Sequence, residues 1–425
     1  MILKSIRNIK RRLTFLFIKL SPFNLFLFFF ISNFKSLKTE KIKVIYIKSP
    51  KFDEEIKLLT KFESKNIIFL PISARLLKTI YSKYFSKNFK YINDYNYDIE
   101  VRNNLSKKLK LFKYWNNFFR ILLKFYNIKC VINPNFIYTY LQEFNRAAQL
   151  NLVKNVTIYK EGINPAYQND FLIQNYYANK KYLGDFIFFK NKSIRNSFEK
   201  VVKISRSKTY ISGLLNIDDF FNLNTENQNQ LFRATLFYSY PEEKKKGLGS
   251  KIYDELDIKN QTEIFYVNFI KVTNLLSDLK FIIKIKKNDH YPPLHELLKK
   301  YKLKLNKNVT VICNEKTVLE CIKNSSIICS FNSSSLIEAL VLKKPIIEPK
   351  LEWNKSNIKH NFLVNFEHLS FKAGSYENLL NYLKENKKIK YLDKDISLIT
   401  EHFFGYIDGN NRKRLINKLV QILNL

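Results

Sequence analysis

The chain has 425 residues, of which 46% are hydrophobic and 15% aromatic, a composition that folds around a large core and excludes a disordered chain. This length predicts two or three domains. The formal net charge of +36 favours anionic partners such as nucleotide phosphates, acidic polymers or an anionic membrane face. The abundance of Lys, Asn, Ile, Phe and Tyr is also what an AT-rich genome encodes, which offers a second explanation of the charge. Because the lysines are scattered along the whole chain, nucleic acid is not predicted as a partner.

The first 36 residues form a basic and apolar segment. "MILKSIRNIKRR" is followed by an apolar stretch whose uninterrupted run, 25–31, is shorter than the roughly 20 residues of a spanning helix. No small-residue cleavage pattern of a signal peptide follows. Two alternatives remain open, an interfacial membrane anchor and a helix packed on the body of the protein. We expect a cytoplasmic protein, peripheral on the inner face of the plasma membrane in the first alternative.

From residue 42 onwards, apolar strand patterns alternate with helical patterns. Strands are predicted at 42–49, 66–73, 129–135 and 155–162, with helices at 109–128 and 138–151. After an Asn-rich linker at 221–230, strands follow at 234–241, 280–286, 308–313, 326–331 and 344–349. Helices are predicted around 262–278, 293–303, 315–323 and 335–342, and a last one ends the chain.

This alternation predicts an α/β fold of two doubly wound, Rossmann-type domains. We place a first domain at 37–220, the linker at 221–230, a second domain at 231–395 and a helical C-terminal segment at 396–425. Ligands of such domains bind at the carboxyl ends of the strands, so a cleft between the two domains is expected to hold the site.

The stretch "SFNSSSLIEALVLKKPIIEP" (330–349) carries the first candidate site. It joins a buried strand to a helix through a polar turn, and the start of a helix offers N–H groups and a positive dipole end to a phosphate. Hydroxyls of Ser333, Ser334 and Ser335 would lie beside such a phosphate, and Glu338 could reach sugar hydroxyls. The alternative, which the pattern alone favours, is a capping box in which Ser335 and Glu338 serve their own helix.

Two further candidates follow strands. In "IYKEGINP", Lys160 and Glu161 place a base and an acid at a carboxyl edge, and a carboxylate in a partly closed cleft can act as a general base. In "FIIKIKKNDHYPP", Lys284, Lys286 and His290 could neutralise a diphosphate leaving group. The alternatives are an exposed Lys-Glu turn and a solvated basic loop.

Several other chemistries lack their residues. The five His form no metal-ligand cluster, so no metal site is predicted, and there is no G-x-S-x-G, G-x-G-x-x-G or P-loop. The four Cys match no zinc spacing and are expected to be buried free thiols in a reducing compartment. Asp408 is expected to be a cap of the last helix or an interdomain contact, and not a catalytic residue.

Three blocks together resemble bacterial surface-carbohydrate and capsule biosynthesis proteins of the GT-B glycosyltransferase-like superfamily. They are "NPNFIYTYLQEFNRAAQLNLVKNVTIYKEGI", "SFNSSSLIEALVLKKPIIEP" and "FFGYIDGNNRKRLINKLVQIL", in that order, and they span roughly residues 130–425. The resemblance implies a GT-B-like fold of two Rossmann domains. It places a nucleotide-sugar donor on the second domain, at Ser333, Ser334 and Glu338, and a glycan or lipid-linked acceptor on the first, with Lys160 and Glu161 in the cleft.

What the resemblance implies is a metal-independent glycosyltransferase of surface polysaccharide synthesis that needs no cofactor beyond its donor. Two alternatives stay open, a nucleotide-sugar 2-epimerase-type enzyme on the same fold and a catalytically inactive, membrane-associated assembly partner. The chain departs from the family at two points. The relatives carry His-Pro where this chain has Lys286 to His290, and "SGLLNIDD" lacks the basic residue of their Gly-x-Pro-Arg turn.

Overall fold

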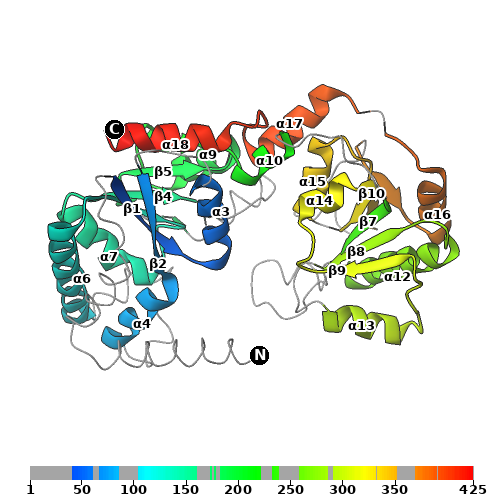
Figure 1. The fold of residues 1–425 in the computed structure, drawn as a ribbon, viewed down its shortest axis with the longest axis horizontal. Helices are drawn as coiled ribbons and strands as arrows, with labels where there is room; N and C mark the ends of the chain where they lie inside the picture. The colour runs from blue at the N-terminus through cyan, green and yellow to red at the C-terminus, as the bar shows by residue number, and fades with distance from the viewer. Residues whose placement is uncertain are drawn as a thin grey trace. The chain divides into compact units, whose positions relative to one another are not determined.

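The structure is a computed structural model. It describes residues 41–60, 67–85, 104–159, 173–174, 177–178, 182–221, 232–238, 258–285, 291–331, 333–351, 369–389 and 391–424. These residues form two compact units, coloured along the chain in Figure 1. Unit 1 contains the described residues from 41 to 159, from 173 to 216 and from 410 onwards, and unit 2 contains those from 217 to 409.

Unit 1 is built on a parallel six-stranded sheet with the order β2-β1-β3-β4-β5-β6. Its strands are β1 (Ile42–Lys48), β2 (Ile67–Ser73), β3 (Ile128–Asn133), β4 (Lys154–Ile158), β5 (Phe186–Phe189) and β6 (Thr209–Ile211). Its helices are α3 (Pro50–Thr60), α4 (Ala74–Tyr84), α6 (Leu105–Phe125), α7 (Thr139–Leu150), α9 (Lys192–Val201), the 3-10 turn η2 (Arg206–Lys208) and α18 (Asn411–Ile422).

Alternation along the strands divides the core of unit 1 into two layers. On β1, Ile45 and Ile47 pack with α4, α6 and α7 around Trp115, whereas Val44 and Tyr46 pack with α3 and α18. Because side chains of a strand point alternately to the two faces, one apolar strand serves both layers. Figure 1 shows α6 and α7 side by side on one side of the sheet.

The last helix, α18, belongs to unit 1 although the chain reaches it through unit 2. Its buried residues include Leu415 and Leu419, which join the layer of α3. At its start, Asn411 Nδ2 donates to the Leu214 carbonyl at 3.1 Å, and Arg412 Nε donates to the Leu215 carbonyl at 2.9 Å. These bonds fix the end of the chain to the first sheet.

Unit 2 is built on a second parallel six-stranded sheet, with the order β12-β11-β10-β7-β8-β9. Its strands are β7 (Phe232–Tyr238), β8 (Phe281–Ile285), β9 (Val309–Ile312), β10 (Ser325–Ser330), β11 (Ile346–Pro349) and β12 (Phe371–Ala373). Its helices are α10 (Asp218–Phe221), α12 (Ile258–Leu275), α13 (Tyr291–Lys300), α14 (Val318–Lys323), α15 (Ser334–Val341), α16 (Tyr376–Glu385) and α17 (Asp393–Phe404), and the 3-10 turn η3 (Leu215–Ile217) lies at the boundary of the units.

The second sheet has the strand order of a dinucleotide-type Rossmann fold, because numbering β7 to β12 from one to six and reading from β9 gives 3-2-1-4-5-6. The order reverses between β7 and β10. A bond across this point, from Ser330 Oγ to the Phe237 carbonyl at 2.9 Å, joins the carboxyl ends of the two strands. A ligand of this fold binds in the crevice beyond these ends.

The predicted α/β fold with two parallel sheets is confirmed. The strands that had not been predicted, β5, β6 and β12, have only four, three and three residues. The prediction of buried free thiols is also confirmed, because all four cysteines are buried and unbonded to one another. Within the described residues, no helix combines the length and hydropathy needed to cross a membrane. The segment 1–36 lies outside them.

Candidate functional site at the switch point of the second sheet

The helix α15 begins directly after β10, at the point where the strand order of the second sheet reverses. Its N-cap is Ser333, whose backbone is extended and whose hydroxyl accepts from the Ser335 N–H at 3.3 Å. The hydroxyls of Ser333 and Ser335 are 2.7 Å apart. Ser333 and Ser334 are half-buried, whereas Ser335 is buried. The first turn therefore presents hydroxyl and N–H groups at the carboxyl edge of the sheet.

The predicted capping box of Ser335 and Glu338 is wrong. Ser335 lies inside the first turn, since the helix begins at Ser334 and Ser333 is the cap. A capping side chain must precede the helix, and a run of three serines offers three positions of which the backbone selects one. The chain does have a capping box, at the start of α14, where Thr317 and Glu320 bond to each other's backbone N–H groups.

Glu338 lies one turn further into α15 and is the most unusual group of the site. It is 7% exposed, and its carboxyl makes no hydrogen bond or ion pair with any residue that the structure describes. Burial raises the pKa of Glu338 to about 8. A buried carboxyl without a partner is costly, and groups of this kind are concentrated at binding and catalytic sites.

Lys284 reaches the same edge of the sheet from β8. In the strand register, Ser330 faces Phe237 and Phe237 faces Lys284, so two strand spacings, about 10 Å, separate Lys284 from the end of β10. The side chain is buried, and its ammonium donates to the Cys313 carbonyl. The pKa of Glu315 is lowered mainly because its carboxylate accepts hydrogen bonds from backbone N–H groups, and the charge of Lys284 contributes to the same shift. In this arrangement the Lys284 ammonium is engaged by a backbone carbonyl just after the neighbouring strand β9.

The structure thus brings Lys284 and the Ser333–Ser335 turn with Glu338 to one sheet edge. Lys160, Glu161, Lys286 and His290 lie outside the described residues, and their roles stay predictions. Among the residues that are described, no three potential metal ligands gather into a cluster.

A second buried carboxyl, Glu348, was not predicted. It lies on β11, accepts a bond from Ser370 at 2.8 Å and forms an ion pair with Lys372 of the neighbouring strand β12. Burial raises the pKa of Glu348, although Lys372 opposes the shift. The signal in the sequence was a single carboxylate inside the apolar strand "PIIEP", which a buried strand tolerates only with a cationic partner.

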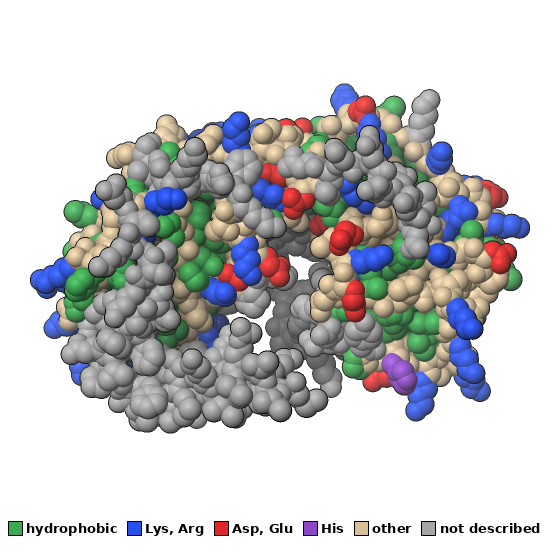
Figure 2. Space-filling model, viewed as in Figure 1, with side chains coloured by type: hydrophobic (Ala, Val, Ile, Leu, Met, Phe, Trp, Pro, Cys, Tyr) green, Lys and Arg blue, Asp and Glu red, His purple; other side chains and the backbone are tan. Residues whose placement is uncertain are grey.

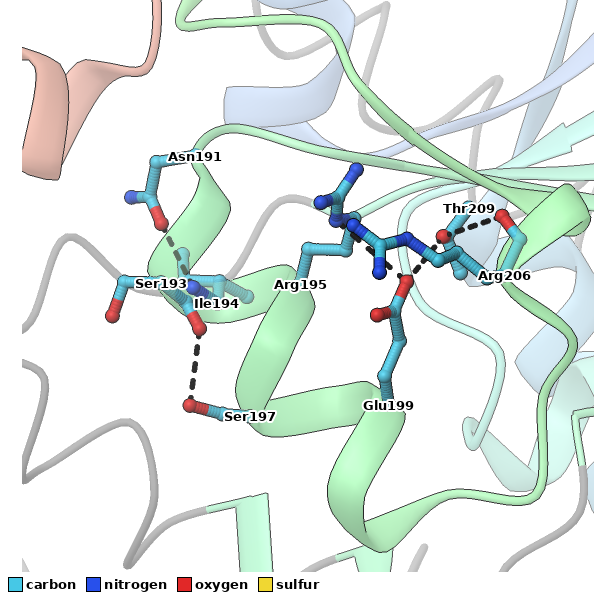
Figure 3. A network of polar contacts seen from close by, with 8 residues as sticks. All are labelled: Asn191, Ser193, Ile194, Arg195, Ser197, Glu199, Arg206 and Thr209. Atoms are coloured by element: carbon cyan, nitrogen blue, oxygen red, sulfur yellow. Dashed lines mark hydrogen bonds and ion pairs between the residues drawn. The ribbon is translucent and has the colours of Figure 1, made fainter.

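In unit 1, a polar network joins α9 to β6 near the edge of the first sheet (Figure 3). Thr209 Oγ1 donates to Glu199 Oε1 at 2.6 Å, and Arg195 Nε is 3.6 Å from the same oxygen. Asn191 caps α9 through the Ile194 N–H at 2.8 Å. Figure 3 shows the Arg206 side chain extending towards Arg195 beside the Glu199 carboxylate. The network holds a short edge strand in place.

No protein-family model matches the chain, and no curated protein matches it either. Similar solved structures do exist. A putative UDP-N-acetylglucosamine 2-epimerase from Listeria monocytogenes shares 11% identity at a TM-score of 0.51, over 91% of this chain and 98% of that one. A further structure of a UDP-N-acetylglucosamine 2-epimerase shares 11% identity at a TM-score of 0.50, over 91% and 97%.

The Anabaena protein Alr3699/HepE, solved with UDP and glucose, shares 9% identity at a TM-score of 0.44, over 89% of this chain and 99% of that one. The likeness to the two epimerase structures, at such low identity, concerns the fold alone. The chain therefore has a GT-B-like fold, two parallel α/β sheets in two units, of a kind that nucleotide-sugar epimerases share.

Proposed function

We propose that this protein is a nucleotide-sugar enzyme that binds a uridine nucleotide on unit 2. The observation that carries the proposal is the start of α15, where half-buried serines and the buried Glu338 meet at the switch point of a Rossmann-ordered sheet. N–H groups at a helix start suit the diphosphate, and the Glu338 carboxyl suits hydroxyls of the ribose or sugar. Lys284 would join the diphosphate if its ammonium leaves the Cys313 carbonyl.

The reaction that the comparisons favour is of the 2-epimerase type. Two similar structures are described as UDP-N-acetylglucosamine 2-epimerases, one of them as putative. Such a reaction inverts the configuration at one carbon of the sugar and needs no acceptor. We keep Glu161, beside Lys160, as the proposed base, because a carboxylate next to a lysine after a strand can exchange a proton near the sugar.

Transfer of the sugar to a glycan or lipid-linked acceptor is the second candidate. It is favoured by the three sequence blocks that resemble surface-carbohydrate biosynthesis proteins. The two reactions differ in what they require. An epimerase converts its nucleotide-sugar alone, whereas a transferase releases the nucleotide only when an acceptor is present.

Binding is tested first, by calorimetric titration with UDP, CMP, GDP and ADP. We expect UDP to bind, and we expect Ser333→Ala and Glu338→Gln to weaken it at least tenfold. Ser375→Ala is the matched control, because the Ser375 hydroxyl also caps a helix, by accepting from the Asn378 N–H at the start of α16, but follows the edge strand β12. Equal loss in the control would assign the effect to helix capping, and no binding of any nucleotide would overturn the proposal.

The reaction is tested next, by following UDP-N-acetylglucosamine with proton NMR. A second sugar configuration formed without acceptor supports epimerisation. Nucleotide release that depends on added acceptor supports transfer. Glu161→Gln should abolish either activity while UDP still binds. Nucleotide binding with neither reaction would mean that the fold has been kept without the chemistry.

A further inference from the structure

The charge of this protein is distributed unevenly over the described helices. α4, α6 and α7 contribute three, six and one Lys or Arg residues, ten in all, against a single acidic residue, Glu143. The six helices α12 to α17 of unit 2 carry seven Lys or Arg residues against nine Asp or Glu. If the positive charge came only from a chain-wide excess of lysine, both groups of helices would carry a similar excess of Lys and Arg over Asp and Glu. The excess of positive charge is therefore concentrated on helices of unit 1, where α18 also carries four Lys or Arg residues and no acid. Of these helices, α4, α6 and α7 pack together in one layer of the core.

The helices α4, α6 and α7 form one layer of unit 1, here called the basic layer. Its single acidic residue does not offset the positive charge on the surface of the layer. Glu143 is 2% exposed and lies 3.6 Å from the buried Lys108 and 3.8 Å from Arg146. Its charge is therefore directed inward, to a cation beneath the surface. Within the described residues of these three helices, no carboxylate reaches solvent.

The longest of the three helices presents its cations as one stripe. Lys110, Lys113, Arg120 and Lys124 are exposed at spacings of three, seven and four residues, which places them on one face of α6. No ion pair joins any of the four to another described residue. The 21 residues of α6 extend over about 30 Å. The opposite face is fixed in the core by Trp115 and its neighbours.

Exposed apolar side chains accompany these cations. On α6, Leu105 is 57% and Leu109 49% exposed, and at the end of α7, Leu150 is 62% and Leu152 90% exposed. Asn151 Nδ2 donates to Asn116 Oδ1 at 2.8 Å, which holds the end of α7 against the middle of α6. Figure 2 shows hydrophobic and basic side chains interspersed along the margin where α6 lies.

Lysines and exposed leucines on one surface are the pattern of interfacial membrane binding. The cations attract anionic headgroups, and the leucines partition into the boundary between headgroups and acyl chains. A nucleic acid would use the cations but would leave the leucines in water, and its recognition relies on arginine and aromatic stacking. We infer that the outward face of α4, α6 and α7 docks on an anionic phospholipid bilayer. This surface is formed by residues other than those of the basic segment 1–36, and the inference does not depend on the proposed enzymatic function.

The full-length protein is tested by co-sedimentation with vesicles of phosphatidylcholine alone or mixed with phosphatidylglycerol. We expect binding to the mixed vesicles only, and loss of binding at high salt. The variant Lys110→Glu/Lys113→Glu changes the surface by four charges. At roughly fivefold per charge near an anionic surface, the partition coefficient should fall by about three orders of magnitude.

The matched control is Lys271→Glu/Lys384→Glu, which makes the same change at exposed lysines of unit 2 that form no ion pair with another described residue. It should lower binding no more than a few fold. Leu105→Asn/Leu109→Asn should weaken binding about tenfold, whereas Leu275→Asn, equally exposed on α12, should not.

Circular dichroism confirms that each variant is folded. Undiminished vesicle binding of the α6 variant would overturn the inference and assign binding to another segment. Equal losses in both double-lysine variants would overturn it as well, since only net charge would then matter. Binding to duplex DNA but not to vesicles would overturn the inference, because the partner of this surface would then be nucleic acid.

Discussion

Replacing Glu338 by Gln should make the protein more stable at neutral and alkaline pH, against the usual effect of substitution in a core. The carboxyl is 7% exposed and without a partner among the described residues, and burial raises its pKa to about 8 from an ordinary 4.5. Between these two values the unfolded chain carries the ionised form while the folded chain keeps the proton. Gln has nearly the same shape and is neutral at every pH.

The magnitude follows from linkage. For an acid whose folded-state pKa is raised, stability is complete below about pH 4.5 and falls as the pH approaches 8, by about 1.4 kcal/mol per pH unit. From about pH 5 to about pH 8 the wild type should therefore lose about 4 kcal/mol relative to Glu338→Gln. For a unit of this size, each kcal/mol corresponds to roughly 2–4 °C, so the melting temperatures should diverge by roughly 10 °C.

The assay is thermal unfolding of both proteins, followed by circular dichroism at a series of pH values. Glu296→Gln, at an exposed carboxylate of α13 in the same unit, is the control and should follow the wild type. Wild-type and Glu338→Gln curves that stay parallel across this range would refute the reasoning, because the carboxyl would then ionise as it does in water. Excess UDP should reduce the divergence if the nucleotide supplies partners to the carboxylate.

Three further substitutions test the packing of the two units. Trp115→Ala should destabilise unit 1 by about 3–5 kcal/mol in urea unfolding, because the indole is 1% exposed in the α6 layer; a loss below about 1 kcal/mol would contradict that packing. Lys372→Met should cost about 3 kcal/mol at alkaline pH by leaving Glu348 without its cation, and less at acid pH where the carboxyl is protonated; a cost independent of pH would argue against the ion pair. Gly213→Ala should lower the melting temperature of unit 1, because φ is +79° and a Cβ would collide with the Asn411 side chain; an unchanged melting temperature would show that α18 can shift without cost.

The architecture could be predicted because its signals are local. Buried parallel strands are continuous apolar runs, and the helices between them have apolar residues at helical spacing, so α/β alternation was legible along most of the chain. Among the strands, the predictions fell short where segments are brief. β6 and β12 have three residues each, and their place in a sheet depends on pairing with a distant neighbour.

The candidate site was predicted in part for the same reason. A polar turn after a buried strand marks a helix start, and the sequence identified the stretch from Ser333 to Glu338. It did not identify the cap, since three successive serines are equivalent until the backbone dihedrals of Ser333 are known. Nor did it show that the Lys284 ammonium is engaged by the Cys313 carbonyl, 29 residues away.

The sequence by itself determined two parallel α/β sheets, the strand-to-helix turn of the candidate site and the excess of positive charge, because each is a property of neighbouring residues or of composition. The tertiary structure decided which strands are adjacent and that α18 packs on the first sheet, through bonds such as that of Asn411 to Leu214, 197 residues apart. It also decided that Glu338 is buried without a partner among the residues that the structure describes. Only the fold assembles α4, α6 and α7 into one basic layer, because their helices are separate along the chain and their shared face arises from packing on the same sheet.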